Sequence, residues 1–295
     1  MRKHDGKESA VLLITGATGN VGRPLVSELL AAGASVRALT RNPEAVNLPD
    51  GVDVVAGDLA DPDCVSDALN GVTAMFVNPA AVGRSAARLL ELADQRGVGR
   101  LVLLSSGAIR DGDDQDGNHS DPLAAWHKGI EAAVTASGLE WTVLRSEEFA
   151  VNVIQQWAAQ VRYSGAVREA YGGATNAVID ERDVAAVAAK TLLRDDDVGR
   201  IYRLTGPQSM SRTGMVAVIA AVLGRDVRFE EVPPEAALEA MVSNGLAQPI
   251  AESVLKMRAG MVGHEAFVSS AVDELTGKPA RSFDKWVSDH AEAFS

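Results

Sequence analysis

The sequence predicts an α/β fold: a doubly wound parallel sheet with helices on both faces, followed by a smaller, mostly helical portion. The first two-thirds of the chain alternate strand-like apolar runs with segments of helix length, which is typical of β-α-β units. The strand-like runs are continuously apolar, as expected for strands covered on both faces. With 295 residues, of which 46% are hydrophobic, the chain is long enough to bury a large core.

The strands expected in the first half of the chain are Val11 to Thr15, Ser35 to Thr40, Val52 to Ala56, Ala74 to Val77, Leu101 to Ser105 and Trp141 to Leu144. Between the first two of them, Val21, Leu25 and Leu29 recur at helical spacing, and Gly33 is expected to end that helix.

Later segments extend the same pattern. Asn176 to Ile179 and Arg200 to Leu204 are expected to be further strands of the sheet, on either side of a helix from Glu181 to Leu193. After Pro207 the pattern becomes helical. The expected C-terminal helices are Met215 to Leu223, Glu235 to Val242, Ala251 to Met261, Ala266 to Leu275 and Phe283 to Phe294.

Composition excludes several classes of protein. The formal net charge is −12, so the surface repels phosphate backbones and nucleic-acid binding is not expected. A single cysteine, Cys64, cannot form an intramolecular disulfide framework, which suits a reducing cytoplasm. The first ten residues lack the apolar core of a signal peptide. The longest apolar run, Met215 to Leu223, is too short to span a membrane, so we expect a cytoplasmic protein without a membrane segment.

A glycine-rich turn follows the first strand and opens the first helix. Thr15 to Gly22 reads TGATGNVG, with glycines at Gly16, Gly19 and Gly22. The first glycine permits a tight turn, the second lets a pyrophosphate approach the backbone, and the third allows close packing of the helix. The residues expected to hold a dinucleotide here are Gly16, Thr18, Gly19, Asn20, Val21 and Gly22. The alternative is a plain tight turn.

The ends of the next strands indicate which dinucleotide binds. Arg41 follows the second strand where an NAD-binding protein would carry an acidic residue, so we expect NADP(H) rather than NAD(H), with the guanidinium on the 2′-phosphate. The alternative is a solvated loop arginine. Asp58 and Leu59 are expected at the adenine, and Asn78 and Pro79 beside the nicotinamide ribose, although all four are also common turn residues.

Further motifs occur in order along nearly the whole chain. They are TRNP at 40–43, GDLAD at 57–61, LLSSGA at 103–108, HKGIEAAVTASGLEWTVLRS at 127–146, Phe149 with Asn152, VIDERDVA at 178–185 and YRLTGP at 202–207. Together with the glycine turn, they resemble the atypical short-chain dehydrogenase/reductase superfamily, in particular its NmrA-like and NAD(P)H:quinone-oxidoreductase-like branch.

The resemblance implies a Rossmann fold that binds NADP(H) and forms a substrate cleft with its C-terminal portion. We therefore expect an NAD(P)-binding Rossmann domain over 1–206 and a mostly helical substrate-binding portion over 207–295, with part of 147–175 contributing to the cleft. The chain departs from the branch at Ser146-Glu147, because the branch usually has proline directly after the arginine.

The tyrosine of ordinary short-chain dehydrogenases is missing. None of Tyr163, Tyr171 and Tyr202 has a lysine four residues later. At the expected place, the helix after Ser105-Ser106 carries Ala124 and, four residues on, Lys128. Standard alcohol dehydrogenation and sugar-nucleotide epimerisation are therefore not expected.

The remaining candidates for acid–base or cofactor roles are Ser105, Ser106, His127 and Lys128, with Phe149 and Asn152 at the substrate. For Lys128 the alternative is a surface charge, and for His127 a structural or solvent-facing ring. The acid-rich segment 111–121 does not match a calcium-binding loop, and no metal is expected.

These features predict an NADP(H)-dependent oxidoreductase acting on a small, conjugated or aromatic carbonyl compound such as a quinone, because such acceptors tolerate the loss of a strong acid. One alternative is an NmrA-like redox sensor that binds NADP(H) without turnover. Another is a lyase, cyclase or isomerase on the same fold. The expected partner is a small-molecule substrate, and the sequence is compatible with a homodimer.

Overall fold

The computed structural model describes residues 10–109 and 121–295. Its main sheet has seven strands in the order β3-β2-β1-β4-β5-β6-β9. The strands are β1 (Val11–Thr15), β2 (Ser35–Thr40), β3 (Asp53–Ala56), β4 (Val72–Val77), β5 (Arg100–Ser106), β6 (Glu140–Ser146) and β9 (Arg200–Leu204). The strand order reverses between β1 and β4, which is where Rossmann-type sheets bind their ligands.

All neighbouring strands of this sheet run parallel. The pairs from β3 to β5 have parallel register throughout. Backbone hydrogen bonds join Glu140 to Gly99 and Gly107 to Ser146, so β5 and β6 run the same way. Equivalent bonds from Gly199 to Trp141 and from Glu147 to Leu204 make β6 and β9 parallel. The predicted doubly wound parallel sheet is confirmed.

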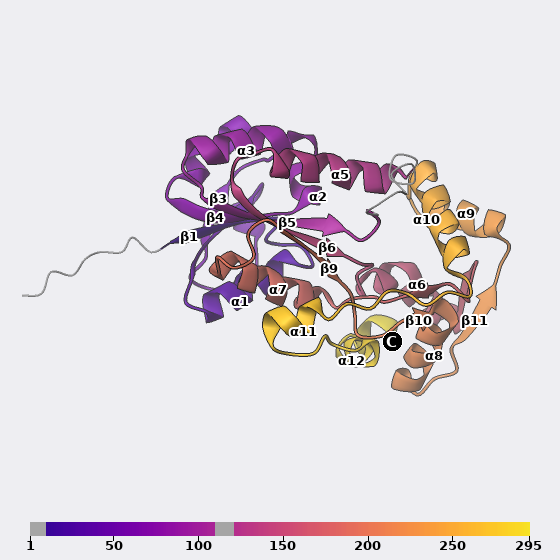
Figure 1. Cartoon of the computed structure of the whole chain (residues 1–295). Helices are drawn as coiled ribbons and strands as arrows, with labels where there is room; N and C mark the ends of the chain where they lie inside the picture. The colour runs from indigo at the N-terminus through magenta and orange to yellow at the C-terminus, as the bar shows by residue number, and fades with distance from the viewer. Residues whose placement is uncertain (1–9, 110–120) are drawn as a thin grey trace, which may run out of the picture. The chain divides into compact units, whose positions relative to one another are not determined.

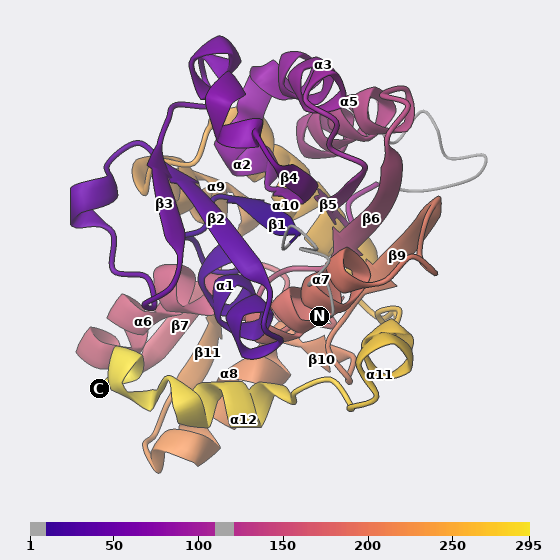
Figure 2. The same cartoon turned by 90° about the vertical axis from the view of Figure 1, so that its left-hand side faces the viewer.

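Helices cover both faces of the sheet, which explains the continuous apolar runs of its central strands β1, β4 and β5. Figures 1 and 2 show α3 (Ala86–Gln95) and α5 (Pro122–Thr135) on one face, with α1 (Gly22–Ala31) and α7 (Glu181–Leu193) on the other. The shorter elements on this part of the chain are η1 (Pro43–Ala45), η2 (Pro62–Leu69), α2 (Pro79–Val82) and η3 (Gly83–Ser85).

The described residues form two compact units that alternate along the chain. The first contains residues 10–105, 129–144 and 185–202, and the second contains 106–109, 121–128, 145–184 and 203–295. The first unit has a core of aliphatic side chains from the sheet, η2, α3 and α5. From the sequence, cofactor binding is assigned to residues 1–206 and substrate binding to residues 207–295. These assignments stay predictions.

The second unit is built from helices and two small sheets. Its helices are α6 (Asn152–Ser164), α8 (Arg212–Leu223), α9 (Pro234–Ser243), α10 (Gln248–Met261), α11 (Ala271–Thr276), α12 (Phe283–Asp289) and the turn η4 (Ala291–Phe294). In the small sheets, β7 (Ala166–Glu169) pairs in parallel with β11 (Arg228–Glu231), and β8 (Thr175–Asn176) pairs antiparallel with β10 (Met210–Ser211). Its core is centred on the buried rings of Trp157 and Trp286.

The segment Asn176 to Ile179 is not a strand of the main sheet, contrary to expectation. Only Asn176 belongs to a strand, the short β8. The rest of the segment lies between two loops, because Ala177 O accepts from Gly206 N, and Ile179 exchanges backbone hydrogen bonds with Glu148 and Ala150. These hydrogen bonds occupy backbone groups of Ala177 and Ile179 that a strand would use for pairing. The edge position beside β6 is taken by β9.

Two expected C-terminal helices are shorter than predicted. Residues 265–269 are not helical, because their backbone donors are taken by side chains: Ala266 N donates to Ser209 Oγ and Ser269 N to Thr205 Oγ1. The last helix ends at Asp289 and is followed by the turn η4. Within the described ranges, no helix has the length and apolar character that crossing a membrane requires.

Candidate functional site

The turn after β1 has the geometry of a phosphate cradle. Gly16 has φ +65°, and its carbonyl accepts a hydrogen bond from Gly19 N at 3.0 Å. A Cβ on Gly22 would lie 2.1 Å from Gly16 O, so only glycine lets α1 start this close to the turn. No side chain caps α1. Arg23 N donates to Gly19 O at 3.1 Å and Pro24 has no N–H, whereas Gly22 N has no partner among the described residues and is available to an anion.

The remaining residues of the turn divide into exposed and buried positions. Thr18, Gly19 and Asn20 are exposed, whereas Val21 is buried in the core. Val21 can therefore offer a ligand only its backbone. Exposed turn residues that lead into an uncapped helix start, with no room for a Cβ at its buried first residue, fit a bound pyrophosphate.

Asn78 and Pro79 lie next to this turn in the first unit. Asn78 N donates to Thr15 Oγ1 at 2.8 Å, and a Cβ on Gly16 would lie 2.7 Å from Asn78 Nδ2. The Asn78 side chain caps α2 through Ala80 N, and Pro79 is its buried first residue. The structure thus brings the ends of β1 and β4 together.

Arg41 and Asp58 follow the ends of β2 and β3, and both are exposed. Arg41 has no hydrogen-bond or ion-pair partner among the described residues, so its guanidinium is available to a ligand. Asp58 accepts a hydrogen bond from Ala60 N at 2.9 Å, which is an ordinary turn contact. Leu59 is a core residue and can offer only backbone groups.

Ser105 is buried near the end of β5 and donates a hydrogen bond to Glu131 Oε1 at 2.5 Å. Glu131 is itself buried, on α5. No sequence pattern links these two residues, which are 26 positions apart. Ser105 thereby supports the end of β5, and its hydroxyl proton is directed at a protein carboxylate.

Helix α5 carries Ala124 and Lys128, at the positions predicted to correspond to the tyrosine and lysine of ordinary short-chain dehydrogenases. Ala124 is buried, and Lys128, one turn later, is half-buried and has no ion-pair partner in the described part of the chain. His127 is half-buried, and its ring meets that of Trp126 edge-on, with centroids 4.6 Å apart. The helix begins at Pro122, and the side chain of the preceding Asp121 accepts from Leu123 N. The rest of the acid-rich segment, 111–120, lies outside the described residues.

Ser106 belongs to the second unit, where the following loop contacts a carboxylate. Ser106 Oγ accepts from Ala108 N at 3.1 Å. A Cβ on Gly107 would lie 2.5 Å from Glu147 Oε1, and Glu147 accepts a hydrogen bond from Arg203 at 2.6 Å. Glu147 belongs to Ser146-Glu147, the point at which the sequence departs from the branch that it resembles. The departure was visible in the sequence, but the link to Arg203 was not.

Phe149 and Asn152 lie at the start of α6 in the second unit. Phe149 is half-buried and bridges to Ile179, and its carbonyl accepts from Asn152 N at 3.1 Å. The neighbouring Glu148 accepts from the amides of Gln156 and Asn176 at 3.0 and 2.8 Å. Sequence reasoning missed this polar group, because its members are far apart in the chain.

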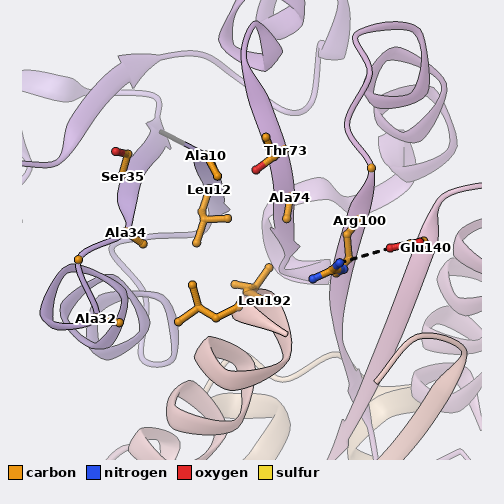
Figure 3. A pocket seen from close by; sticks show the side chains of 13 residues that line it. Ala10, Leu12, Ala32, Ala34, Ser35, Thr73, Ala74, Arg100, Glu140 and Leu192 are labelled. Atoms are coloured by element: carbon orange, nitrogen blue, oxygen red, sulfur yellow. Dashed lines mark hydrogen bonds and ion pairs between the residues drawn. The ribbon is translucent and has the colours of Figure 1, made fainter. Parts of the chain in front are cut away.

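A hollow of about 490 Å³ in the first unit lies at the opposite strand ends. It is lined at the amino ends of β1, β2, β4 and β5 by residues including Leu12, Ser35 and Thr73 (Figure 3). Arg100 and Glu140 form an ion pair at its rim. None of the predicted ligand-binding residues lines it. The described ranges contain no group of side chains suited to a metal ion.

Comparisons with known proteins agree with this geometry. Residues 16–195 match a family described as NAD(P)H-binding. The chain is 38% identical to a (4-alkanoyl-5-oxo-2,5-dihydrofuran-3-yl)methyl phosphate reductase of Streptomyces griseus, over 97% of this chain and 99% of the relative. It is 31% identical to an NAD(P)H azoreductase of Xenophilus azovorans, over 96% and 99% of the two chains.

Among solved structures, the fold is similar to that of an NADPH-dependent quinone oxidoreductase from Escherichia coli in complex with NADPH. The TM-score is 0.78 at 24% identity, covering 95% of this chain and 99% of the other. The matched range contains the three glycines of the turn and five of the seven strands of the main sheet, all but β1 and β9. The chain therefore belongs to the NAD(P)H-binding family, has the fold of the atypical short-chain dehydrogenases/reductases, and is an NAD(P)H-dependent oxidoreductase.

Proposed function

We propose that this chain transfers a hydride from NADPH to a small conjugated or aromatic carbonyl compound, such as a quinone or an unsaturated lactone. The observation that carries the proposal is the buried Ala124 one helical turn before Lys128, where ordinary members have tyrosine. Without the tyrosine as an acid, the favoured substrates are those whose π system delocalises the negative charge that the hydride brings. Water can then supply the proton.

The relatives support a conjugated acceptor. The Streptomyces griseus protein is named for a dihydrofuranone whose ring double bond is conjugated with its carbonyl. The other two names refer to azo compounds and quinones. These acceptors differ in size and charge and share only a conjugated system that can take up a hydride.

For the cofactor, we propose that the turn holds the pyrophosphate through Gly16, Thr18, Gly19, Asn20, Val21 and Gly22. Arg41 binds the 2′-phosphate and makes NADP(H) the preferred dinucleotide. Asp58 and the Leu59 backbone contact the adenine. On the nicotinamide side we assign Asn78, Pro79, Ser105 and Lys128.

For the substrate, we propose that Ser106, His127, Phe149 and Asn152, all in the second unit, contact the reacting compound. Lys128 and His127 are the candidate proton carriers. The cytoplasmic location and the homodimer stay predictions.

The test is NADPH oxidation by the purified protein with a panel of quinones, enones and simple ketones. Turnover is expected on the conjugated acceptors and not on simple ketones. Arg41→Ala is expected to weaken NADPH binding by about tenfold or more while leaving NADH binding unchanged, because it loses a charge-assisted hydrogen bond. Comparable rates on simple ketones and quinones, or tight NADPH binding without any turnover, would contradict the proposal.

A further inference from the structure

An ion pair lies where three strands of the main sheet end. Glu147 directly follows β6, and Arg203 is next to the last residue of β9. Glu147 Oε1 accepts a hydrogen bond from Arg203 NH2 at 2.6 Å. The carboxyl ends of parallel strands are where α/β proteins bind their ligands.

The Glu147 carboxylate touches the loop that follows β5. A Cβ on Gly107 would lie 2.5 Å from Oε1 of Glu147, so the carboxylate packs directly against the backbone of Gly107. Gly107 N also donates to Ser146 O at 2.8 Å, so the two loops are fixed to each other. The pair thus lies beside Ser106, a predicted catalytic residue.

Arg203 is held in place but keeps unused hydrogen-bond donors. Its guanidinium carbon lies 4.7 Å from the ring centroid of Phe267, which is 54% exposed. A guanidinium has five N–H donors, and Nε of Arg203 is buried without a partner in the described part of the chain. The Arg203 side chain as a whole is 41% exposed. A carboxylate and a ring therefore fix its position, and its tip remains accessible.

We propose that Arg203 donates hydrogen bonds to the carbonyl oxygen of the conjugated substrate and stabilises the negative charge that develops there. This inference rests on the proposed function. NADPH, when bound, would supply the hydride and be oxidised to NADP⁺. As the hydride bonds to the β-carbon, the π electrons of the C=C bond would shift toward the carbonyl oxygen, and water would then protonate the α-carbon of the enolate.

The charge balance favours a carbonyl oxygen over a phosphate as the group recognised. Glu147 already compensates the charge of Arg203, so the pair offers a dianion little net attraction. A carbonyl oxygen needs N–H donors in fixed positions rather than net charge, and such preorganised donors act where charge develops in the transition state. Glu147 is then a positioning residue.

The kinetic test compares Arg203→Met and Arg203→Lys with the wild type on 2(5H)-furanone. For Arg203→Met, kcat/KM is expected to fall about 100-fold, with the NADPH dissociation constant unchanged. Arg203→Lys keeps a cation and should recover part of the loss. Arg168→Met is the matched control, because Arg168 forms a similar ion pair with Glu230 on the exposed face of β7 and should lose nothing.

A binding test does not depend on turnover. Tetronate, the ionised 4-hydroxy analogue of the furanone, resembles the enolate. It should bind to the NADP⁺ complex of the wild type and at least tenfold more weakly to that of Arg203→Met. Inorganic phosphate should not displace it from the wild type. It should do so in Glu147→Gln, where the charge of Arg203 is no longer compensated.

The outcomes separate this inference from the proposed function. If the wild type reduces no conjugated acceptor, the proposed function fails. The comparison of tetronate affinity between the wild type and Arg203→Met then still tests whether Arg203 binds an enolate oxygen. Equal tetronate affinity of the wild type and both Arg203 variants, or no saturable binding to the wild type, overturns the inference. Displacement of tetronate from the wild type by phosphate also overturns it.

Discussion

Gly22 marks the closest approach of α1 to the turn that precedes it. A Cβ there would lie 2.1 Å from Gly16 O and 2.8 Å from Ala17 Cα, and both atoms belong to the backbone. Gly22→Ala should therefore lower the free energy of unfolding by about 2 to 3 kcal/mol and weaken NADPH binding, because the turn must shift. Urea unfolding and a fluorescence titration with NADPH measure the two effects.

Gly129 provides the matched control. It lies inside α5, and an added Cβ would meet no atom within 4 Å. Gly129→Ala should leave NADPH affinity unchanged and stabilise the protein by up to about 1 kcal/mol, because alanine is the better helix former. If both variants bound NADPH like the wild type, the turn would not have the role assigned to it.

At the scale of elements, a buried ionic network joins β7, α8 and α10 in the second unit. Glu169 accepts hydrogen bonds from Arg212, and Arg258 lies 3.5 Å from the same carboxylate. Arg212 also lies over the ring of Trp157 on α6. Burial raises the pKa of Glu169, but the two guanidinium groups outweigh this effect and hold the pKa below its ordinary value.

The Glu169→Gln variant should lose about 3 to 5 kcal/mol of stability at pH 7, because two buried cations lose their shared anion. A carboxyl whose folded-state pKa is lowered contributes its stability above its unfolded value, near 4.5, and loses it as the pH falls through the folded-state pKa. The difference between wild type and variant should therefore shrink in acid. Urea unfolding at pH 7 and pH 4 tests this; a difference independent of pH would contradict it.

The start of α7 has the opposite pH dependence. Burial raises the pKa of Glu181, and the negative charge of the neighbouring Asp180 adds to the effect. Trp286 and His290, both within 4 Å of the carboxylate, lower the pKa, but the net shift is upward. The folded protein then holds this proton more tightly than the unfolded chain. Ionisation therefore destabilises the fold as the pH rises above about 4.5, the ordinary value.

The Glu181→Gln variant removes this ionisation and should raise Tm at pH 8 by about 2 to 4 °C. Below pH 4.5 the advantage should disappear, because Glu181 is then protonated in both states. The exposed Glu239→Gln on α9 is the control and should leave Tm unchanged. Calorimetry across this pH range measures the effect, and a Tm gain that persisted in acid would rule out this explanation.

On the scale of the whole molecule, each compact unit is assembled from separate stretches of chain. The core of the second unit packs Val153 and Trp157 of α6 against Ile219 of α8 and Trp286 of α12. A fragment of residues 1–206 lacks both α8 and α12 and should therefore expose the apolar face of α6. We expect it to aggregate or bind a hydrophobic dye, and to show no cooperative unfolding by circular dichroism. A soluble fragment with a cooperative transition would contradict this.

Local sequence pattern was sufficient for much of the first unit. Strands β1, β2 and β9 have the predicted limits, as does helix α7. A continuous apolar run or a glycine turn extends over only a few neighbouring residues. Strand and turn conformations are determined over the same short stretch of chain, so the sequence predicts them directly. Asn176 to Ile179 has the same apolar character, yet tertiary contacts with two loops keep it out of the main sheet.

The sequence by itself determined the α/β class, the parallel sheet, the glycine turn and the absence of a tyrosine four residues before a lysine. The tertiary structure alone decided which distant side chains meet. It placed Glu147 against Gly107 and joined it to Arg203, 56 residues away. It also gathered Glu169, Arg212 and Arg258 into one buried network. Periodicity fixes which side of an element is buried, whereas contacts between elements depend on the path of the whole chain.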